Sequence, residues 1–300
     1  MYKGDAEGRL LPVNIVGLEN TPTAFTLCDF DGDLFKDAAV TLGDGHLYIY
    51  YSNGMGYFSD NFDSLGLGPD PAAAAPVDIV VMDVDDDTLD DLAIANNGTR
   101  TISIVRRSLE QNYFDATFMG SAGSEDAAPV ALAVGDFENV TGLISDDLIV
   151  ATKGGTIELF MMSGESAVWV DYDAATNNID AGSEWIVDMT SGTFFGAPTP
   201  SLAILVTGAD PVISPSGSYI NLVKIEAENE SDHIYSGVQR LVLEGADPVV
   251  IHAGVFANKD GDLAVGNGNC VIELFLQDSP GSFRHETMGI LSERYLFDRL

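Results

Sequence analysis

Residues 28–54 read CDFDGDLFKDAAVTLGDGHLYIYYSNG, and four of the first ten are aspartates: Asp29, Asp31, Asp33 and Asp37. Three of them stand at alternate positions, and the fourth follows four residues after the third. An apolar run typical of a β-strand begins directly after the fourth aspartate. The stretch therefore predicts a tight acidic loop at the start of a strand.

The acidic loop recurs along the chain. Residues 82–108 read MDVDDDTLDDLAIANNGTRTISIVRRS and reproduce the spacing with Asp83, Asp85, Asp87 and Asp91. A weaker copy in 134–164 keeps Asp136, Glu138 and Asp147, with three extra residues before the last of these. Two degenerate copies keep mainly the strand that follows the loop. At the position of Asp37, the last aspartate of the first loop, one has Ser201 and the other has Asp262; the copy with Ser201 also retains Asp188.

The final places of the five copies, residues 37, 91, 147, 201 and 262, are 54, 56, 54 and 61 residues apart. A period of this size indicates a propeller or solenoid built from one supersecondary unit. Each unit predicts four strands: a small apolar strand buried on both faces before the loop, a second directly after it, an alternating half-buried third and an irregular fourth. Long helical periodicity is absent, so helix is expected to be minor.

These patterns predict an all-β protein, a β-propeller of about five four-stranded blades in which the first strand of each blade lies nearest the axis. The expected blades of this single domain, residues 1–300, are 23–75, 76–128, 129–181, 182–246 and 247–291, with an extra outer strand at 10–18. Two arrangements stay open: a five-bladed ring with an additional edge strand, or a piece of a longer array.

Aspartates at places one, three, five and nine of a loop can direct their oxygens at one point, and the backbone carbonyl at place seven, Phe35 or Leu89, can join them. Six to eight oxygen ligands at flexible geometry suit Ca²⁺ better than Mg²⁺, which requires a stricter octahedron. We expect calcium in the first two loops, weak or absent binding at Asp136, Glu138 and Asp147, and none in the last two loops.

The motifs DFDGDLFKDAAV and DVDDDTLDDLAI, with GDFENVTGLISDDLIV as a degenerate third, resemble the FG-GAP or VCBS repeats that form integrin-α-type propeller blades. The resemblance implies calcium bound between the first two strands of a blade, and an extracellular or cell-surface protein of the adhesion, lectin or enzyme-accessory kind. This chain departs from the family in showing five repeats instead of the usual seven, and two of its repeats lack the metal motif.

Acidic residues dominate the charge of the chain. Asp and Glu number 47 against 13 Lys and Arg, which gives a formal net charge of −34 at pH 7. Nucleic acids and anionic membranes need clustered cations, so neither is an expected partner. No apolar run approaches the roughly 18 residues of a membrane span, so no membrane insertion is expected. Cations are the natural partners, although a solubilising acidic surface explains the excess charge equally well.

Other short signals leave alternatives open. The two cysteines, Cys28 and Cys270, are too few for a disulfide framework, and their pairing is left undecided. The first residues show no signal-peptide pattern, as expected either of a cytoplasmic chain or of an exported one without its signal. Sequons at Asn97, Asn139 and Asn229 permit glycosylation of an exported glycoprotein.

Catalytic motifs are lacking. The four histidines have no zinc-like spacing, and neither a nucleophile elbow nor a phosphate loop is present. Aromatic residues that could stack on sugars are expected to pack between blades instead; they are Tyr48, Tyr50, Tyr51, Trp169 and Trp185. We therefore expect a non-enzymatic module that binds protein or glycan or associates with itself. The alternatives are a structural subunit of a surface layer or filament, and a polysaccharide-active enzyme or its accessory domain.

Overall fold

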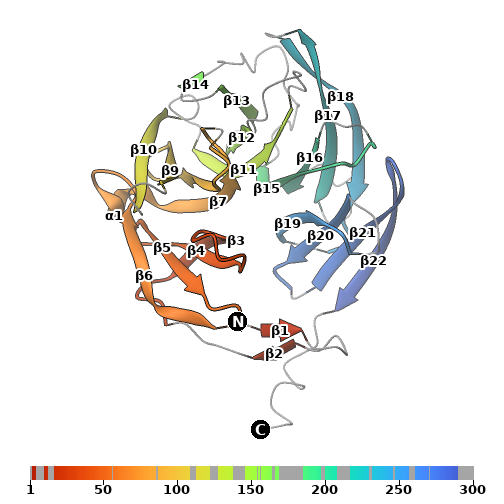
Figure 1. Ribbon diagram of the computed structural model, residues 1–300. Coiled ribbons are helices and arrows are strands. Elements are labelled where there is room, and N and C mark those ends of the chain that lie inside the picture. Colours follow the sequence, from red (N-terminus) through yellow and green to blue (C-terminus); the bar gives the residue numbers. More distant parts are fainter. Residues whose placement is uncertain are drawn as a thin grey trace. The chain divides into compact units, whose positions relative to one another are not determined.

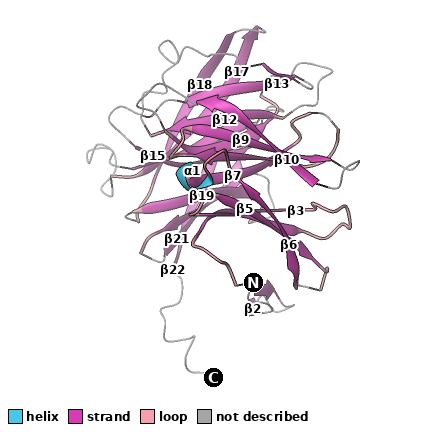
Figure 2. Ribbon diagram, turned by 90° about the vertical axis from the view of Figure 1, so that its left-hand side faces the viewer, coloured by secondary structure: helices cyan, strands magenta, loops and turns pink. Residues whose placement is uncertain are grey.

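The computed structural model describes residues 2–4, 10–12, 17–55, 57–85, 87–108, 113–121, 128–137, 146–153, 155, 157–163, 166–168, 185–196, 200–207, 217–229, 232–245, 247–256, 261–269 and 271–289. Strands make up most of this part of the chain, and its single helix is the four-residue α1 (Pro71–Ala74), drawn in cyan in Figure 2. The expected all-β class is confirmed. Among the described residues, no helix has the length and apolar character needed to cross a membrane.

The chain forms two compact units, Met1–Pro129 and Val130–Leu300. The first unit holds two four-stranded antiparallel sheets (Figure 1, red to yellow), with sheet orders β3-β4-β5-β6 and β10-β9-β8-β7. The strands of the first sheet are β3 (Pro22–Cys28), β4 (Asp37–Leu42), β5 (His46–Ser52) and β6 (Phe58–Gly66). Those of the second are β7 (Pro76–Met82), β8 (Asp91–Asn96), β9 (Thr101–Ser108) and β10 (Tyr113–Ser121).

The beginning of the first unit differs from the expected outer strand at 10–18. The strand there is β2 (Leu10–Pro12), and it pairs with β1 (Tyr2–Gly4) in a separate two-stranded sheet. Residues 17 and 18 follow no strand pattern, and 13–16 lie outside the described residues. The strand that the sequence suggested is therefore short and has a local partner.

The second unit holds three four-stranded sheets, each in simple chain order. Their strands are β11 (Pro129–Gly135), β12 (Asp147–Thr152), β13 (Ile157–Ser163), β14 (Ser166–Val168), β15 (Trp185–Gly192), β16 (Ser201–Thr207), β17 (Tyr219–Asn229), β18 (Asp232–Val242), β19 (Pro248–Gly254), β20 (Asp262–Asn267), β21 (Val271–Ser279) and β22 (Ser282–Gly289). β22 is the fourth strand of the last sheet, so that sheet is complete without the start of the chain.

The strand buried on both faces is the second of each sheet, not the first. Every residue of β8 and β12 is buried, as are five of six in β4. The first strands lie at one edge of their sheets, and three of them, β3, β7 and β19, carry exposed residues: in β3, Phe25 is 69% exposed and Leu27 50%. The expectation of doubly buried first strands is therefore wrong for β3, β7 and β19. The third strands β5 and β9 are more deeply buried than expected, each with four consecutive buried residues, whereas β21 has the mixed burial expected of a half-buried strand.

The buried faces pack sheet against sheet within each unit. In the first unit, Leu47 and Ile49 of β5 pack with Ile79 of β7 and with Leu92 and Ile94 of β8. In the second unit, two similar cores join β11–β14 to β15–β18 and β15–β18 to β19–β22. Sheets whose strands are apolar on both faces favour such stacking. A β-propeller is built from four-stranded sheets that pack in this way.

Candidate metal centres

Two acidic loops of the first unit occupy the same place in their sheets. The first loop, residues 29–37, joins β3 to β4, and the second loop, residues 83–91, joins β7 to β8. In each, the first aspartate directly follows the first strand, and the last aspartate is the first residue of the next strand. The pairing of Cys28 with Asp37 and of Met82 with Asp91 closes each loop at its base.

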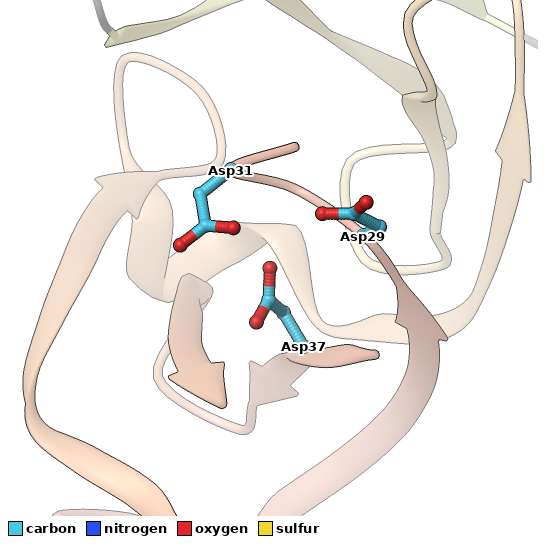
Figure 3. A group of neighbouring side chains, drawn as sticks. All are labelled: Asp29, Asp31 and Asp37. Carbon is cyan, nitrogen blue, oxygen red and sulfur yellow. The ribbon is translucent and has the colours of Figure 1, made fainter. Parts of the chain in front are cut away.

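Three carboxylates converge in each loop. In the first loop, Asp29, Asp31 and Asp37 each place an oxygen within 4.8 Å of the others, and their side chains turn toward a common space in Figure 3. Asp83, Asp85 and Asp91 form the corresponding group in the second loop. These two triads are the candidate metal centres, and they bring together six of the eight aspartates that the sequence singled out.

The remaining two aspartates stabilise the turn within each loop. Oδ1 of Asp33 accepts a hydrogen bond from the backbone N–H of Phe35 at 2.8 Å, and Oδ1 of Asp87 accepts the equivalent bond from Leu89 at 2.8 Å. These are Asx-type bonds, in which the side chain replaces a backbone acceptor in a turn. Neither aspartate belongs to its triad, a distinction that the spacing of the four residues does not predict.

Backbone N–H groups surround the first carboxylate of the first loop. Asp29 accepts hydrogen bonds from Gly32 at 2.7 Å, Asp33 at 3.1 Å and Leu34 at 2.9 Å. Desolvation raises the pKa of Asp29, but these bonds and the charge of Arg107 outweigh it, so the net pKa is lowered. The turn requires left-handed backbone at Gly32, where φ is +82°, which glycine adopts without steric cost. The Asp29 carboxylate is thus held ionised and in place.

The last aspartate of the first loop is fully buried. Oδ2 of Asp37 accepts from the N–H of Phe30 at 2.8 Å, and Oδ1 accepts from Ser52 at the end of β5 at 2.7 Å. Burial raises the pKa of Asp37, the two hydrogen bonds oppose the rise, and the charges of Asp31 and Asp33 add to it. This carboxylate therefore ties the loop to the third strand and contributes an oxygen to the triad.

We call the hydrogen bonds from backbone N–H groups to the last aspartate of the loop the tie. It recurs in sheets where no triad forms among the described residues. Asp262 is buried and accepts from Phe256 at 2.9 Å and from Gln277 at 2.7 Å, and Asp147 accepts from Phe137 at 2.8 Å. At the equivalent place in the fourth sheet, Oγ of Ser201 is buried and has no hydrogen-bond partner among the described residues. The final aspartate is thus a structural residue of the repeat as well as a candidate ligand.

In the second triad, the pKa values of two carboxyl groups, Asp85 and Asp91, are raised. Burial raises the pKa of Asp91 from 3.8 to about 6; hydrogen bonds from Arg107 and Val84 oppose the rise, and the charges of Asp85 and Asp87 add to it. The pKa of Asp85 is also raised, first by burial and then by the charge of Asp87, while the charge of Arg106 and a hydrogen bond from the backbone of Asp87 oppose the rise. Its Oδ1 is shielded from solvent and accepts no hydrogen bond from the described residues. A buried oxygen without a donor, among other carboxylates, is the arrangement that a cation would stabilise.

The weaker loops lie partly outside the described residues. Asp136 is exposed and Asp147 is buried, whereas Glu138 and Asn139 are not described. In the fourth sheet, Gly192 pairs with Ser201, so the first residue of the loop is Thr193 and not Asp188. In the fifth sheet, the first residue of the loop is Val255. Asp188 lies within β15, where its Oδ2 accepts from Ile251 of β19 at 2.8 Å. It joins neighbouring sheets and is not a loop residue.

Several other expected sites have structural partners. Nδ2 of Asn97, the atom that glycosylation would modify, donates to the carbonyl of Pro129 at 3.1 Å. The side chain of Asn229 is not described. Tyr48 and Tyr50 are buried and pack against Phe62, as expected of core aromatics. Trp169 and the Trp185 side chain lie outside the described part of the chain.

Cys28 is buried and carries a free thiol, whereas Cys270 is not described. Burial raises the pKa of this thiol to about 12, and its hydrogen bond to Asp90 contributes to the rise. The thiol is therefore protonated at neutral pH and donates its proton to Oδ2 of Asp90. This contact links the end of β3 to the second loop.

Comparison with known proteins identifies the fold and no family. No family model matches the chain, and no curated protein matches it. Among solved structures, BBS1N in complex with ARL6DN, soaked with lead, is 16% identical with a TM-score of 0.53, covering 91% of this chain and 70% of that chain. The same complex soaked with mercury is 17% identical with a TM-score of 0.53, covering 92% and 71%. The chain therefore resembles the N-terminal β-propeller domain of BBS1, and its four-stranded antiparallel sheets are consistent with a β-propeller.

Proposed function

We propose that the chain is a calcium-stabilised β-propeller of about five blades that serves as a binding or assembly module outside the cell. The observation that carries the proposal is the pair of aspartate triads at equivalent places in two successive sheets. One acidic cluster on a surface is common, but two with the same ligand positions and the same closing tie argue for a selected cation site.

The donor set favours calcium. Asp29, Asp31 and Asp37 would hold one ion and Asp83, Asp85 and Asp91 the other, with the carbonyls of Phe35 and Leu89 as further donors. Carboxylates, carbonyls and water form the all-oxygen shell that Ca²⁺ prefers, and the described residues bring neither histidine nor thiol into the triads. Oδ1 of Asp85, which is shielded from solvent and has no hydrogen-bond partner among the described residues, supports a cation at the second triad. A bound ion would neutralise the clustered charge and stabilise the loops.

Partial exposure of the loops supports action outside the cell. Asp31 and Asp33 are exposed, so water competes for the first ion and the expected affinity is modest. Calcium sites of extracellular modules have dissociation constants of about 10⁻⁴ to 10⁻³ M, which match the calcium concentrations they meet. The resemblance of the loops to FG-GAP or VCBS repeats supports the same localisation.

A protein or glycan ligand, or another copy of this chain, is the proposed partner. The net charge of −34 disfavours nucleic acid. BBS1N, which has a similar fold, was crystallised in complex with ARL6DN, and this favours a partner-binding role for the present chain. We propose no catalytic residue, because the two carboxylate triads are explained by metal binding.

Calcium titration of the chelator-treated full chain tests the metal sites. We expect calorimetry to detect two ions beyond the binding of a variant carrying both Asp31→Asn and Asp85→Asn. Calcium uptake equal to that of the double variant would refute the proposal. Sedimentation with and without calcium, followed by a glycan-binding screen, then separates self-assembly from ligand binding. Hydrolysis of a screened polysaccharide would favour the enzyme alternative instead.

A further inference from the structure

Two contacts join the first and second loops of the first unit. One passes through Arg107 at the end of β9, and the other through Cys28 at the end of β3. Both cross between the two sheets of this unit. The Arg107 contact ends on Asp29, a triad residue, and the Cys28 contact ends on Asp90, the neighbour of the triad residue Asp91. The contacts therefore connect the two candidate calcium sites directly.

Arg107 contacts both loops at once. Its backbone N–H donates to Oδ1 of Asp91 at 2.7 Å, so its main chain is fixed by a ligand of the second loop. Its Nη1 donates to the carbonyl of Asp29 at 3.3 Å, and a Cβ built on Gly32 would lie 3.6 Å from its Nη2. The guanidinium therefore covers the turn of the first loop, while the backbone N–H of the same residue is hydrogen-bonded to the second loop.

The second contact reaches from the first sheet to the second loop, whereas Arg107 reaches from the second sheet to the first loop. Cys28 pairs with Asp37 at the base of the first loop, and its thiol donates to Oδ2 of Asp90, the residue before Asp91. Movement of either loop base therefore displaces the other. The side-chain contacts, from Arg107 to the Asp29 carbonyl and from Cys28 to Asp90, use no carboxylate oxygen of the two triads, so both can persist when the triads hold ions.

We propose that the two loops bind calcium cooperatively and that Arg107 is the positioning residue that couples them. The inference rests on the proposed calcium function. An ion in the second loop fixes Asp91, which fixes Arg107 and thereby orders the Asp29 carbonyl and the Gly32 turn before the second ion arrives. Binding of an ion to the first loop then costs less conformational entropy of that loop. The coupling is therefore positive, and it is reciprocal.

Repulsion between the two ions does not reverse this sign. The first loop has four aspartates and one lysine, and the second has six aspartates. Each loop therefore keeps a net negative charge after taking up one Ca²⁺, so the ions are locally neutralised. Residual repulsion between exposed charges is screened at physiological ionic strength, where the Debye length is about 8 Å.

A calcium titration of the full chain by calorimetry tests the coupling. Asp85→Asn leaves the first loop as the single intact site, Asp31→Asn leaves the second, and the variant with both changes gives the background. We expect the wild-type curve to be steeper than the sum of the single-site curves, with an about tenfold coupling of affinities, inside the usual range of about 5–150-fold. In Arg107→Met, which keeps the backbone N–H and the apolar stem, coupling should fall below about twofold.

Control variants separate position from charge. Arg284→Met removes one exposed cation from β22 of the second unit and should keep the full coupling. Arg107→Lys keeps the charge but loses the planar fork, and it should restore only part of the coupling. Should Arg107→Met lose its strand signal in circular dichroism, Cys28→Ala, which removes the other contact alone, is expected to reduce the coupling at least twofold.

The outcomes distinguish the two proposals. A wild-type curve equal to the sum of the single-site curves, or coupling that survives in a folded Arg107→Met or Cys28→Ala protein, overturns the cooperative pair and leaves calcium binding intact. Calcium uptake no greater than that of the double variant overturns the proposed function, and the coupling with it.

Discussion

At the residue scale, the last aspartate of the acidic loop combines two roles that sequence alone does not separate. Asp37 and Asp91 are buried acceptors of two backbone hydrogen bonds, and they also face two other carboxylates. Asp262 forms the same two hydrogen bonds without a described triad. The tie therefore explains why an aspartate stands at this place even in a loop with too few ligands for an ion.

Asp85 offers a test at this scale because its effect should change sign with calcium. In chelator, Asp85→Asn removes a charge from a partly buried carboxylate cluster, so the free energy of unfolding should rise by about 0.5–1 kcal/mol. In millimolar calcium the same change removes a ligand, so the variant should be less stable than the wild type. Thermal unfolding in both conditions measures the crossover.

Asp70→Asn is the matched control for this crossover. Asp70 precedes α1, forms no side-chain cap hydrogen bond and lies away from both loops in sequence. Its replacement should shift the melting temperature by the same small amount with and without calcium. A destabilised Asp85→Asn protein in chelator would mean that the second triad is not under electrostatic repulsion.

At the element scale, the tie joins the loop after the first strand to the end of the third strand. In the last sheet this means that Asp262, at the start of β20, connects Phe256 to Gln277 of β21. Three successive strands of one sheet are thereby fixed at the same end. The tie is a property of the repeat and should act whether or not calcium is present.

Asp262→Ala should therefore destabilise the protein independently of calcium. The change leaves the N–H groups of Phe256 and Gln277 without their acceptor, and a buried unsatisfied group costs about 1–3 kcal/mol. We expect a loss of roughly 2–4 kcal/mol in the free energy of unfolding, measured by denaturant titration in calcium and in chelator. Asp70→Ala, at an exposed position before α1, is the control and should have little effect. A loss seen only in calcium would instead identify Asp262 as a metal ligand.

At the scale of the whole molecule, both triads belong to the first unit. Met1–Pro129 contains the first and second loops, whereas the described residues of Val130–Leu300 contribute no group of three converging acidic side chains. Calcium should therefore stabilise the two units unequally. A ligand that binds only the folded state adds about 2.7 kcal/mol per site at a hundredfold excess over Kd.

Hydrogen exchange with and without calcium measures this inequality. We expect calcium to slow exchange in β3, β4, β7 and β8 and to leave β19 and β20 nearly unchanged, since a bound ion raises the cost of opening the strands that hold it. Removing calcium should also lower the melting temperature. Equal protection in both units, or an unchanged melting temperature in chelator, would contradict the assignment of the ions to the first two loops.

The sequence determined what depends on local pattern. Alternation of apolar residues, the repeat period and the shared spacing of Asp29, Asp31 and Asp37 with Asp83, Asp85 and Asp91 were sufficient for the all-β class, the four-strand unit and the two candidate centres. Each of these follows from contacts between residues close in the chain. Strand ends and acidic loops are visible locally because neighbouring residues form them.

Tertiary structure alone decided what depends on residues far apart in the chain. Burial of a strand is set by the sheets that cover it, so β4 and β8 are buried while β3 is an exposed edge. Asp33 shares the spacing of the triad residues but lies outside the triad, and its Oδ1 accepts the turn N–H of Phe35. Arg107 reaches Asp29 across 78 residues, a contact that only the packing of two sheets can create. Spacing in the sequence predicts which residues can converge, and packing decides which of them do.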